Sequence, residues 1–322
     1  MLLLVFIIIS IVSIIGTFLP FFPSKHWFFR DFDYVRSHLL VVNLALFMLS
    51  FFWEPWFFFI VLQALLFISF LVQFYFIYPF INFSLTKKDF STSSDTLSVL
   101  SINVHQNNNK YSALVDLIKK TDSDIVFTME TNKIWEENIS EIESIYPYTK
   151  KVALENMYGM HVYSKRELLL SEVLFLKSDE RPTMHLKIEM QKDRVLHFFW
   201  VHPPPPSPTE ADTSKPKDTE LAILWKKISK ISNDVIVTWD FNSVAWSEWI
   251  KKFQALSQLK DGRRWRWLYP SCPAKFGSFA FPIDLLFHSK WVEVSKLETL
   301  ENIGSDHLPI YFEIWVIPTK HS

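Results

Sequence analysis

The segment VIVTWDFN (residues 235–242) runs from β-branched residues directly into two polar side chains, Asp240 and Asn242. β-Branched residues favour strands, so this segment predicts a buried strand with polar groups at its carboxyl end. Further polar residues stand beside other apolar runs, namely Asn103, Glu130, His202, Asp284, Asp306 and His307. One such residue alone is commonly a helix cap or a surface charge. Their repetition along the chain instead indicates one polar site at the edge of a sheet.

Around these residues, segments with the alternating apolar pattern of a strand are followed by segments with the apolar spacing of a helix. We expect strands at 97–104, 124–129, 159–163, 184–190, 195–201, 235–238, 283–288 and 308–316. We expect helices at 110–120, 217–232 and 245–258. This order predicts an α/β sandwich. The stretch 203–217 contains six prolines, which have no backbone N–H and a fixed φ, and it is expected to be a loop.

The first 80 residues have a different composition. No charged side chain precedes Lys25, and residues 39–80 contain one charge, Glu54. A bilayer core of about 30 Å needs about 20 helical residues. A cleaved signal peptide would carry a basic amino-terminal region and a small-residue cleavage site, and neither is present. We therefore expect three transmembrane helices, at about 1–22, 38–54 and 56–80, within a membrane region at 1–81, then a linker at 82–96 and a soluble domain at 97–318.

Lysine and arginine in the connections indicate the orientation. Residues 20–38 carry Lys25, Arg30 and Arg36, whereas the turn at Glu54 carries none. Such residues favour the cytoplasmic side, and three spans place residues 20–38 on the same side as the soluble domain. The sequence therefore predicts an integral membrane protein with a cytoplasmic soluble domain and the lipid bilayer as a partner.

Charge and cysteine content exclude two classes of protein. The formal net charge is -1, which excludes a strongly basic protein held on nucleic acid by bulk electrostatics. The single cysteine, Cys272, excludes an internal disulfide and a zinc site built from cysteines.

The polar strand ends supply the groups that phosphate-ester hydrolysis needs. The carboxylates of Glu130 and Asp306 and the amide of Asn103 are hard oxygen ligands, which suit Mg²⁺ or Mn²⁺. We expect His307, oriented by a carboxylate such as Asp284, to take a proton from water.

Two more residues complete this chemistry. His202 and Asn242 can donate hydrogen bonds to the non-bridging oxygens of a phosphate, as an oxyanion clamp does. We find neither a serine or cysteine nucleophile motif nor a phosphate-binding glycine loop in the sequence.

Together these segments resemble the endonuclease/exonuclease/phosphatase superfamily. In chain order they are SINVHQNN, IVFTMET, YGMHVYSK, WVHPPPP, VTWDFNS, IDLLF and GSDHLPI, within residues 97–317. The resemblance implies a four-layer α/β sandwich of two packed mixed sheets flanked by helices, here preceded by the three transmembrane helices. The attached helices resemble the membrane-anchored bacterial branch, which implies a multi-pass protein of the bacterial inner membrane.

The resemblance also implies roles for matching residues. Glu130 would be the principal ligand of Mg²⁺ or Mn²⁺, with Asn103 and Asp306 beside it. His307 and Asp284 would form the proton-abstracting pair.

Four further residues receive roles in the same way. Asp240 would position the attacking water or protonate the leaving oxygen. Asn242 would hold the phosphate, and His202 would contact the scissile phosphate. Tyr163, in a strand beside the site, would have a supporting role.

Three positions depart from the usual pattern of the superfamily. Trp239 stands where glycine precedes the D-F-N segment, Met129 where glutamine precedes the metal glutamate, and Leu285 where histidine follows I-D. Glycine permits close backbone approach, so Trp239 is expected to reshape the pocket. None of these changes removes a proposed catalytic group.

The sequence indicates the type of reaction more closely than it indicates the substrate. The cluster GRRWRWLY (262–269), with Arg263, Arg264 and Trp265, could bind nucleic acid through phosphate contacts and stacking. It could equally meet phospholipid or inositol-phosphate headgroups, or its tryptophans could pack inward. The sequence therefore predicts a membrane-anchored, Mg²⁺-dependent phosphodiesterase, and the alternative is a weakened enzyme that serves as a binding scaffold.

Overall fold

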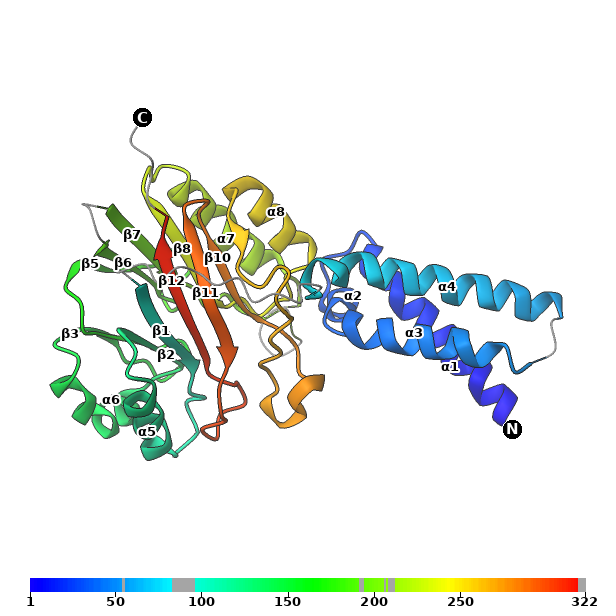
Figure 1. The fold of residues 1–322 in the computed structure, drawn as a ribbon, viewed down its shortest axis with the longest axis horizontal. Coiled ribbons are helices and arrows are strands. Elements are labelled where there is room, and N and C mark those ends of the chain that lie inside the picture. The colour runs from blue at the N-terminus through cyan, green and yellow to red at the C-terminus, as the bar shows by residue number, and fades with distance from the viewer. Residues whose placement is uncertain (54–55, 83–95, 191–193, 206, 208–211, 318–322) are drawn as a thin grey trace.

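The computed structural model describes residues 1–53, 56–82, 96–190, 194–205, 207 and 212–317. A bundle of N-terminal helices and a two-sheet sandwich lie end to end (Figure 1). The expected turn at Glu54–Pro55 and most of the expected linker, residues 83–95, lie outside the described residues.

The first sheet is mixed, with the strand order β11-β12-β1-β2-β4-β3. Its central strands β1 (Thr96–Asn103) and β2 (Ile125–Met129) are parallel. The outer strands are antiparallel to their neighbours and comprise β3 (Tyr148–Val152), β4 (Met160–Ser164), β11 (Val292–Thr299) and β12 (Ile310–Val316). Since Asn103 is the register partner of Met129, this pairing brings Glu130 next to Asn103.

The second sheet is also mixed, with the order β5-β6-β7-β8-β10-β9. Strands β7 (Arg194–Trp200) and β8 (Asp234–Asp240) are its parallel central pair. The remaining strands are β5 (Leu168–Leu174), β6 (Thr183–Met190), β9 (Lys260–Asp261) and β10 (Asp284–His288). Because β10 is antiparallel to β8, Asp284 lies directly opposite Asp240.

Helices cover the outer face of each sheet. Helices α5 (Tyr111–Thr121) and α6 (Lys133–Asn138) pack on the first sheet, and α7 (Lys215–Ile228) and α8 (Glu248–Ser257) pack on the second (Figure 1). Between the sheets lies an apolar core in which the rings of Phe127 and Trp200 stack 4.6 Å apart. The predicted α/β fold, with two mixed sheets flanked by helices, is therefore confirmed.

The expectation of three transmembrane helices needs correction. Among the residues that the structure describes, two N-terminal segments are long and apolar enough to cross a membrane. They are Leu2–Phe21 and Phe57–Phe80, which contain α1 (Leu2–Phe18) and α4 (Phe57–Ile77). Helix α3 (Arg36–Ser50) has only 15 residues, about 22 Å at about 1.5 Å per residue, which is shorter than a bilayer core of about 30 Å. Helix α3 reaches the length of a membrane span only when it is counted together with Trp27–Asp33, which contains α2 (Trp27–Arg30). The two parts are bent by 67° relative to each other.

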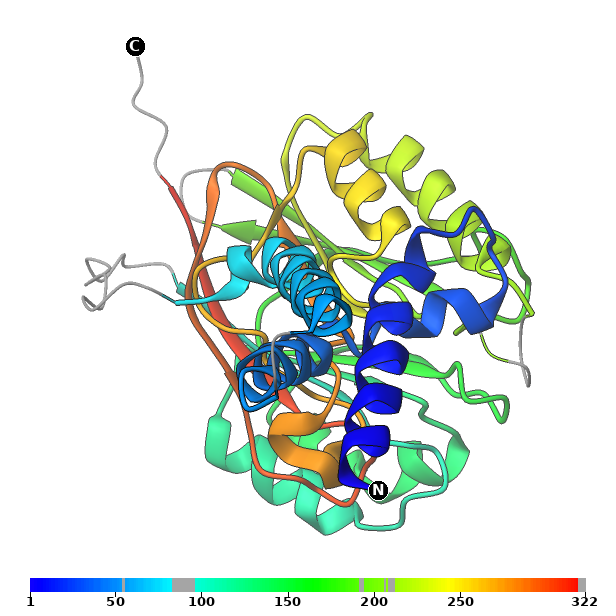
Figure 2. The ribbon, with the colours of Figure 1, turned by 90° about the vertical axis from the view of Figure 1, so that its right-hand side faces the viewer.

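A polar network joins α3 to the two longer helices, which lie beside it in Figure 2. Asn43 of α3 accepts from Ser13 Oγ at 2.9 Å and donates to Thr17 Oγ1 at 3.1 Å, and both partners belong to α1. Gln73 of α4 donates to the same Thr17 hydroxyl at 3.2 Å. All four side chains are buried. Polar residues in apolar bundles face inward and pair with one another, so this network fixes how the helices pack.

The strands that the sequence did not predict are β3, β5, β9 and β11, which are the edge strands of the two sheets. The predicted central strands, by contrast, were found. Strands β3 and β5 are half-exposed along most of their length. Neither has buried residues that alternate with exposed ones, so the pattern that predicts a half-buried strand is weak there. The short helix α6 was missed as well.

Helix α7 contains a buried carboxylate, Glu220, whose exposed fraction is 3%. Neither of its carboxylate oxygens has a hydrogen-bond partner among the described residues, and Arg181 Nε lies 3.9 Å away. Burial raises the pKa of Glu220 from 4.5 to about 7, although Arg181 opposes the shift. Ionised Glu220 therefore destabilises the fold.

Glu220→Gln is expected to stabilise the protein at pH 8 and to leave its stability nearly unchanged at pH 4, below the unfolded pKa of 4.5. The pKa of Glu220 is higher in the folded protein than in the unfolded chain. The protonated side chain therefore contributes stability that is present at low pH and is lost as the pH rises through about 7. At about 1.4 kcal/mol per pKa unit, the gain at pH 8 is at most about 3–4 kcal/mol. Denaturant unfolding at both pH values measures it, with the exposed Glu137→Gln as control. Equal effects at both pH values would contradict the prediction.

Candidate active site

Asn103 and Glu130 meet at the ends of the parallel strands β1 and β2. Asn103 Nδ2 donates to Glu130 Oε1 at 2.7 Å and lies 3.4 Å from Asp240 Oδ2. The second oxygen of Glu130 accepts the backbone N–H of Gln106 at 3.3 Å. Asn103 is fully buried, whereas Glu130 is half-buried. The Glu130 carboxylate is thus oriented by its neighbours and still reachable from solvent.

Asp240, at the end of β8, connects the strand ends of the two sheets. Its side chain is buried, and Oδ1 accepts the backbone N–H of Asn242 at 2.8 Å. Oδ2 lies 3.5 Å from Nε2 of His202 and 3.5 Å from Nε2 of His307. His202 follows β7 of the second sheet, and His307 precedes β12 of the first. One carboxylate therefore contacts residues from both halves of the sandwich.

His307 and Asp284 form a buried pair. The Nδ1–H of His307 donates to Asp284 Oδ2 at 3.0 Å, and its backbone N–H donates to Ser305 Oγ at 3.1 Å. Its Nε2 consequently faces Asp240. A carboxylate on Nδ1 fixes the imidazole tautomer and leaves Nε2 for proton transfer, the arrangement found in His–Asp catalytic pairs. The structure therefore brings the expected pair into direct contact.

Burial and close charges shift the proton affinities of this cluster. Burial raises the pKa of Asp240, and His307 and His202 oppose the shift without cancelling it. Burial alone would lower the pKa of His307, but Asp284 and Asp240 together raise it well above its ordinary value of 6.5. A nearby cation would lower the pKa of His307 again. Proton binding and cation binding at this cluster thus oppose each other.

The donor groups fit a hard divalent cation. Asp240, Asp284 and His307 each place one ligand atom within 4.8 Å of the other two. Asp284 Oδ1 is buried and has no hydrogen-bond partner among the described residues, which is costly for a carboxylate oxygen. Carboxylate oxygens are the ligands that Mg²⁺ prefers. With Glu130 nearby, the cluster therefore contains a carboxylate oxygen, Asp284 Oδ1, that the hydrogen bonds among the described residues leave without a partner.

Asp306 lies beside His307 in the loop that leads to β12. Its side chain is 52% exposed, and Oδ1 is 3.9 Å from His105 Nδ1. A carboxylate oxygen of Asp306 also lies within 4.8 Å of ligand atoms of Cys272 and His307. The expected grouping of Asp306 with Glu130 is not seen as a direct contact within the described segments, and Asp306 stays a proposed ligand.

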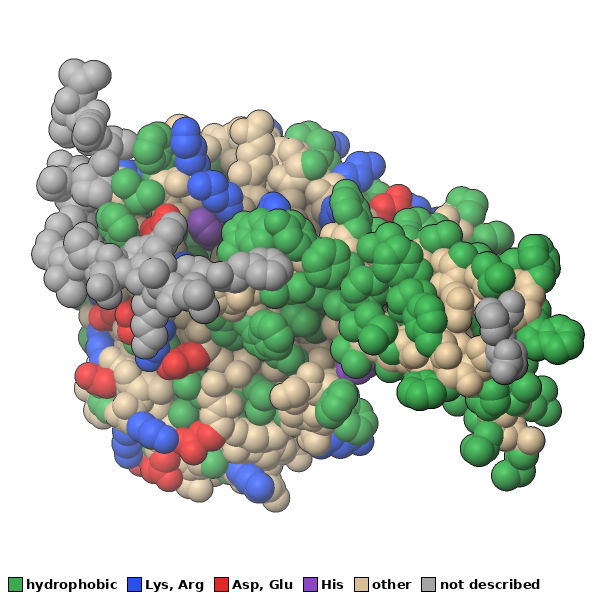
Figure 3. Space-filling model, turned by 45° about the vertical axis from the view of Figure 1, so that its right-hand side comes forward, with side chains coloured by type: hydrophobic (Ala, Val, Ile, Leu, Met, Phe, Trp, Pro, Cys, Tyr) green, Lys and Arg blue, Asp and Glu red, His purple; other side chains and the backbone are tan. Residues whose placement is uncertain are grey.

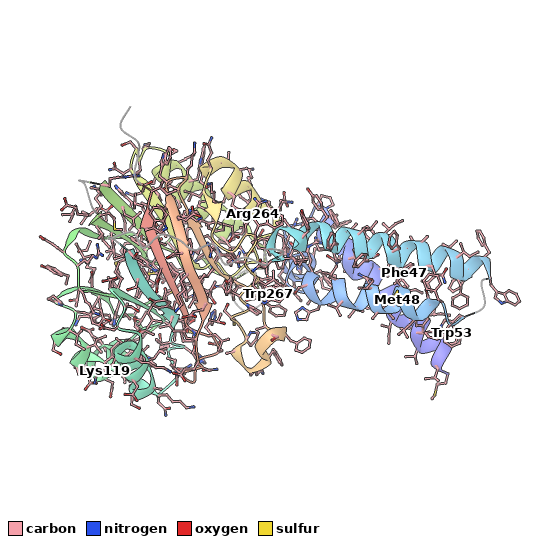
Figure 4. The ribbon with its side chains drawn as sticks, viewed as in Figure 1. Phe47, Met48, Trp53, Lys119, Arg264 and Trp267 are labelled. Carbon is pink, nitrogen blue, oxygen red and sulfur yellow. The ribbon has the colours of Figure 1, made fainter. Side chains whose placement is uncertain are left out.

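Arg263 differs from its neighbours in the basic-aromatic cluster. It is 1% exposed, and its guanidinium binds both oxygens of Asp261, with Nε–Oδ1 at 3.0 Å and Nη2–Oδ2 at 2.8 Å. Arg264 and Trp265 are exposed, and Figure 4 shows Arg264 near the junction with the helices. The expected substrate role of Arg263 is therefore corrected, because a buried, paired guanidinium cannot reach a substrate. Arg264 and Trp265 remain proposed contacts.

Trp239 keeps a backbone conformation that favours glycine. Its φ is 139°, a region that costs a larger residue conformational energy. Its side chain is 1% exposed and belongs to the core between the sheets. It pairs in register with Leu285. The tryptophan therefore changes the core behind the site, while Asp240 still faces Asp284 in the next pair of the register.

Some neighbours of the site were not anticipated. Cys272 Sγ lies within 4.8 Å of a ring nitrogen of His307, the ring of Tyr158 lies 4.8 Å from that of His202, and Ser305 Oγ donates to the Asn103 carbonyl at 2.7 Å. Ser305 and Tyr158 had a sequence signal, through their places in GSDHLPI and YGMHVYSK, whereas Cys272 had none. The expected supporting residue Tyr163 is fully buried, and its hydroxyl lies 3.1 Å from His161 Nδ1.

The sandwich part of the chain matches a known protein family. The model of the Endonuclease/Exonuclease/phosphatase family matches residues 100–307, more than half of the chain. The chain belongs to the endonuclease/exonuclease/phosphatase family. It is accordingly a hydrolase that acts on phosphate esters. Among curated proteins, no sequence matches significantly.

Several solved structures share the fold of the sandwich. D. rerio TDP2 complexed with single strand DNA product is 16% identical, with a TM-score of 0.57, and the match covers 69% of this chain and 99% of that chain. An endonuclease/exonuclease/phosphatase from Bacteroides vulgatus is 15% identical, with a TM-score of 0.55 and coverages of 69% and 99%. A functionally unknown conserved protein from Enterococcus faecalis V583 is 12% identical, with a TM-score of 0.56 and coverages of 68% and 100%. These likenesses concern the fold alone.

Proposed function

We propose that the chain is a membrane-anchored, divalent-metal-dependent phosphodiesterase whose catalytic domain spans residues 97–318. The observation that carries this proposal is the buried contact of His307 with Asp284, with Nε2 facing Asp240, directly beside Asn103 and Glu130. Packing alone gives no reason to bury so many ionisable groups at one place, because burying charges destabilises a fold.

In the proposed mechanism, His307 Nε2 takes the proton of the attacking water while Asp284 holds the imidazole in place. Asp240 positions that water or protonates the leaving oxygen. His202 and Asn242 donate to the non-bridging oxygens of the phosphate.

Glu130, Asn103 and Asp306 are the proposed holders of Mg²⁺ or Mn²⁺, and Asp240 and Asp284 lie close enough to contribute. A bound divalent ion supplies charge neutralisation at the phosphoryl oxygens. The same positive charge lowers the pKa of His307, so that Nε2 is free to accept a proton.

The helices carry the proposal of membrane anchoring. Large apolar side chains such as Leu2 and Phe57 are 78% and 82% exposed, and hydrophobic side chains cover much of the bundle in Figure 3. A surface this apolar is typical of contact with lipid or another protein. Residues 20–38 contact the catalytic domain, as the Tyr34 Oη–Asn242 O hydrogen bond shows, so their Lys25, Arg30 and Arg36 support a cytoplasmic catalytic domain in a multi-pass protein of a bacterial inner membrane. A reporter fused after Ser322 tests the orientation, and activity confined to the outside would contradict it.

The substrate proposed is a phosphodiester, either in nucleic acid or in a phospholipid or inositol phosphate. The full-length chain in detergent would be assayed with Mg²⁺ or EDTA on single-stranded DNA, phosphoinositide, sphingomyelin and bis(p-nitrophenyl) phosphate. We expect turnover only with the metal. Inactivity on every substrate would refute the proposal.

Glu130→Gln is expected to weaken Mg²⁺ binding by about 10- to 100-fold, the effect typical of perturbed metal sites. The substitution removes a negative charge while keeping the shape of the side chain. Isothermal titration of the full-length chain with Mg²⁺ measures it directly, and Glu137→Gln on the exposed face of α6 is the control. Equal affinity in the variant and the wild type would exclude Glu130 as a ligand.

A non-catalytic scaffold is the second candidate, favoured by the strained Trp239. Such a scaffold would bind phosphate esters without hydrolysing them and would show no site-specific Mg²⁺ binding. The same titration separates the two functions, because loss of Mg²⁺ affinity in Glu130→Gln would argue against the scaffold.

A further inference from the structure

The segment between α1 and α3 lies directly against the segment that follows β8. Tyr34 Oη donates to the backbone oxygen of Asn242 at 2.5 Å. In the opposite direction, Trp246 Nε1 donates to the backbone oxygen of Asp33 at 2.7 Å. We name residues 240–247 the catalytic loop, because they begin with Asp240 and include Asn242. Two hydrogen bonds of opposite direction therefore join the helical part of the chain to this loop.

Asn242 is held at each of its backbone polar groups. Its N–H donates to Asp240 Oδ1 at 2.8 Å, and its carbonyl accepts from Lys217 Nζ at 2.8 Å as well as from Tyr34. Its side-chain amide donates to the Pro203 carbonyl at 3.1 Å. The φ of Asn242 is 44°, in the left-handed region. Such a conformation persists where surrounding contacts determine it, and the Tyr34 hydroxyl supplies one of these contacts.

An apolar cluster joins the same two parts of the chain. Ile77, the last residue of α4, and Phe80, three residues after it, pack with Val244 and Trp246 of the catalytic loop and with Ile283. All five side chains are buried. Ile283 immediately precedes Asp284 in the sequence. The end of the helical bundle thus packs behind both carboxylates that contact His307.

Asp33 is in turn fixed by the bundle. Arg36 Nε donates to Asp33 Oδ1 at 2.9 Å, and Arg36 Nη1 donates to Gln73 Oε1 on α4 at 3.1 Å. Gln73 also bonds Thr17 of α1. Both Arg36 and Gln73 are buried. A continuous chain of hydrogen bonds therefore runs from the interior of the bundle to the backbone of residue 33, which holds the catalytic loop.

We propose that Tyr34 and Asp33 are positioning residues for the catalytic loop, so that the N-terminal helices are part of the active-site scaffold as well as an anchor. The catalytic consequence rests on the proposed function, whereas the structural coupling does not. A sandwich without residues 1–82 would lack these supports of Asn242, Asp240 and Asp284.

The test uses Tyr34→Phe in the full-length chain, which removes one hydroxyl and keeps the ring. With bis(p-nitrophenyl) phosphate and saturating Mg²⁺, kcat is expected to fall by about 10- to 100-fold, as for other supporting hydrogen bonds behind a catalytic site. KM is expected to stay nearly constant, since misplacement of Asn242 and Asp240 acts in the transition state. Trp246→Phe, which removes the reciprocal bond to Asp33, is expected to lower kcat as well.

Tyr146→Phe is the matched control. The Tyr146 hydroxyl is buried in the first sheet's outer core and donates to the Ser123 carbonyl at 2.9 Å, so the substitution also removes one tyrosine–backbone bond. It is expected to lower the Tm as much as Tyr34→Phe does while leaving kcat unchanged. If both variants retain the wild-type kcat, or both lose it equally, the positioning role is overturned.

Amide hydrogen exchange provides a readout that needs no substrate. Residues 240–247 are expected to exchange faster in Tyr34→Phe than in the wild type or in Tyr146→Phe. Unchanged exchange would overturn the coupling, whatever the activity. Faster exchange together with a wild-type chain that is inactive on the probe would count against the proposed function and in favour of the coupling.

Discussion

His307→Ala is expected to lower kcat for phosphodiester hydrolysis by about 10²- to 10⁴-fold, the range that general acid–base groups contribute. His307 Nδ1 is held by Asp284 at 3.0 Å, and Nε2 lies 3.5 Å from Asp240. Alanine removes the only imidazole fixed between these two carboxylates among the described residues. The measurement is steady-state hydrolysis of bis(p-nitrophenyl) phosphate by the full-length chain at saturating Mg²⁺.

Two further variants sharpen this prediction. Asp284→Asn should lower kcat by a similar factor, and the double variant should be little worse than either single one, because residues that act as a unit are strongly non-additive. His288→Ala is the control, since His288 is also a buried histidine but lies at the opposite end of β10. His307→Ala with wild-type kcat, or additive losses in the double variant, would argue against a catalytic pair.

Arg263→Ala is expected to destabilise the fold by about 3–5 kcal/mol, the typical cost of leaving a buried charge without its partner. Asp261 is 4% exposed, and both its oxygens bind the Arg263 guanidinium. Denaturant unfolding followed by tryptophan fluorescence measures the loss.

The matched control is Arg264→Ala, one residue further along. Arg264 is exposed, so its removal should change stability by less than about 0.5 kcal/mol. Replacing both partners, as in Arg263→Met with Asp261→Leu, should recover most of the stability, because an apolar pair leaves no unpaired charge. A mild effect of Arg263→Ala, equal to that of Arg264→Ala, would contradict the ion pair.

The sequence predicted the central strands of both sheets. Strands β2 and β8 are buried along their whole length, and strands covered on both faces read as continuous apolar runs. Polar residues at the ends of such runs are therefore conspicuous. This pattern predicted Asn103, Glu130 and Asp240 as site residues, and the structure places them in contact.

Other features had no comparable signal. The edge strands β3 and β5 are half-exposed and show no regular alternation of buried and exposed residues. Arg263 and Arg264 are adjacent and chemically identical in the sequence, and only packing separates a buried ion pair from an exposed charge. Helix α3 was expected to span a membrane because its composition is apolar, yet it ends at Ser50 after 15 residues.

By itself the sequence determined the α/β sandwich class, the apolar character of the N-terminal helices and the identity of the polar strand ends, because these depend on local periodicity and on residue chemistry. The tertiary structure alone decided which of these side chains meet. The parallel pairing of β1 with β2 joins Asn103 to Glu130, and the register of β10 on β8 sets Asp284 opposite Asp240. It alone decided that Tyr34, more than 200 residues from Asn242, supports the catalytic loop. Contacts between residues so far apart in the chain arise from long-range packing, which local sequence patterns do not encode.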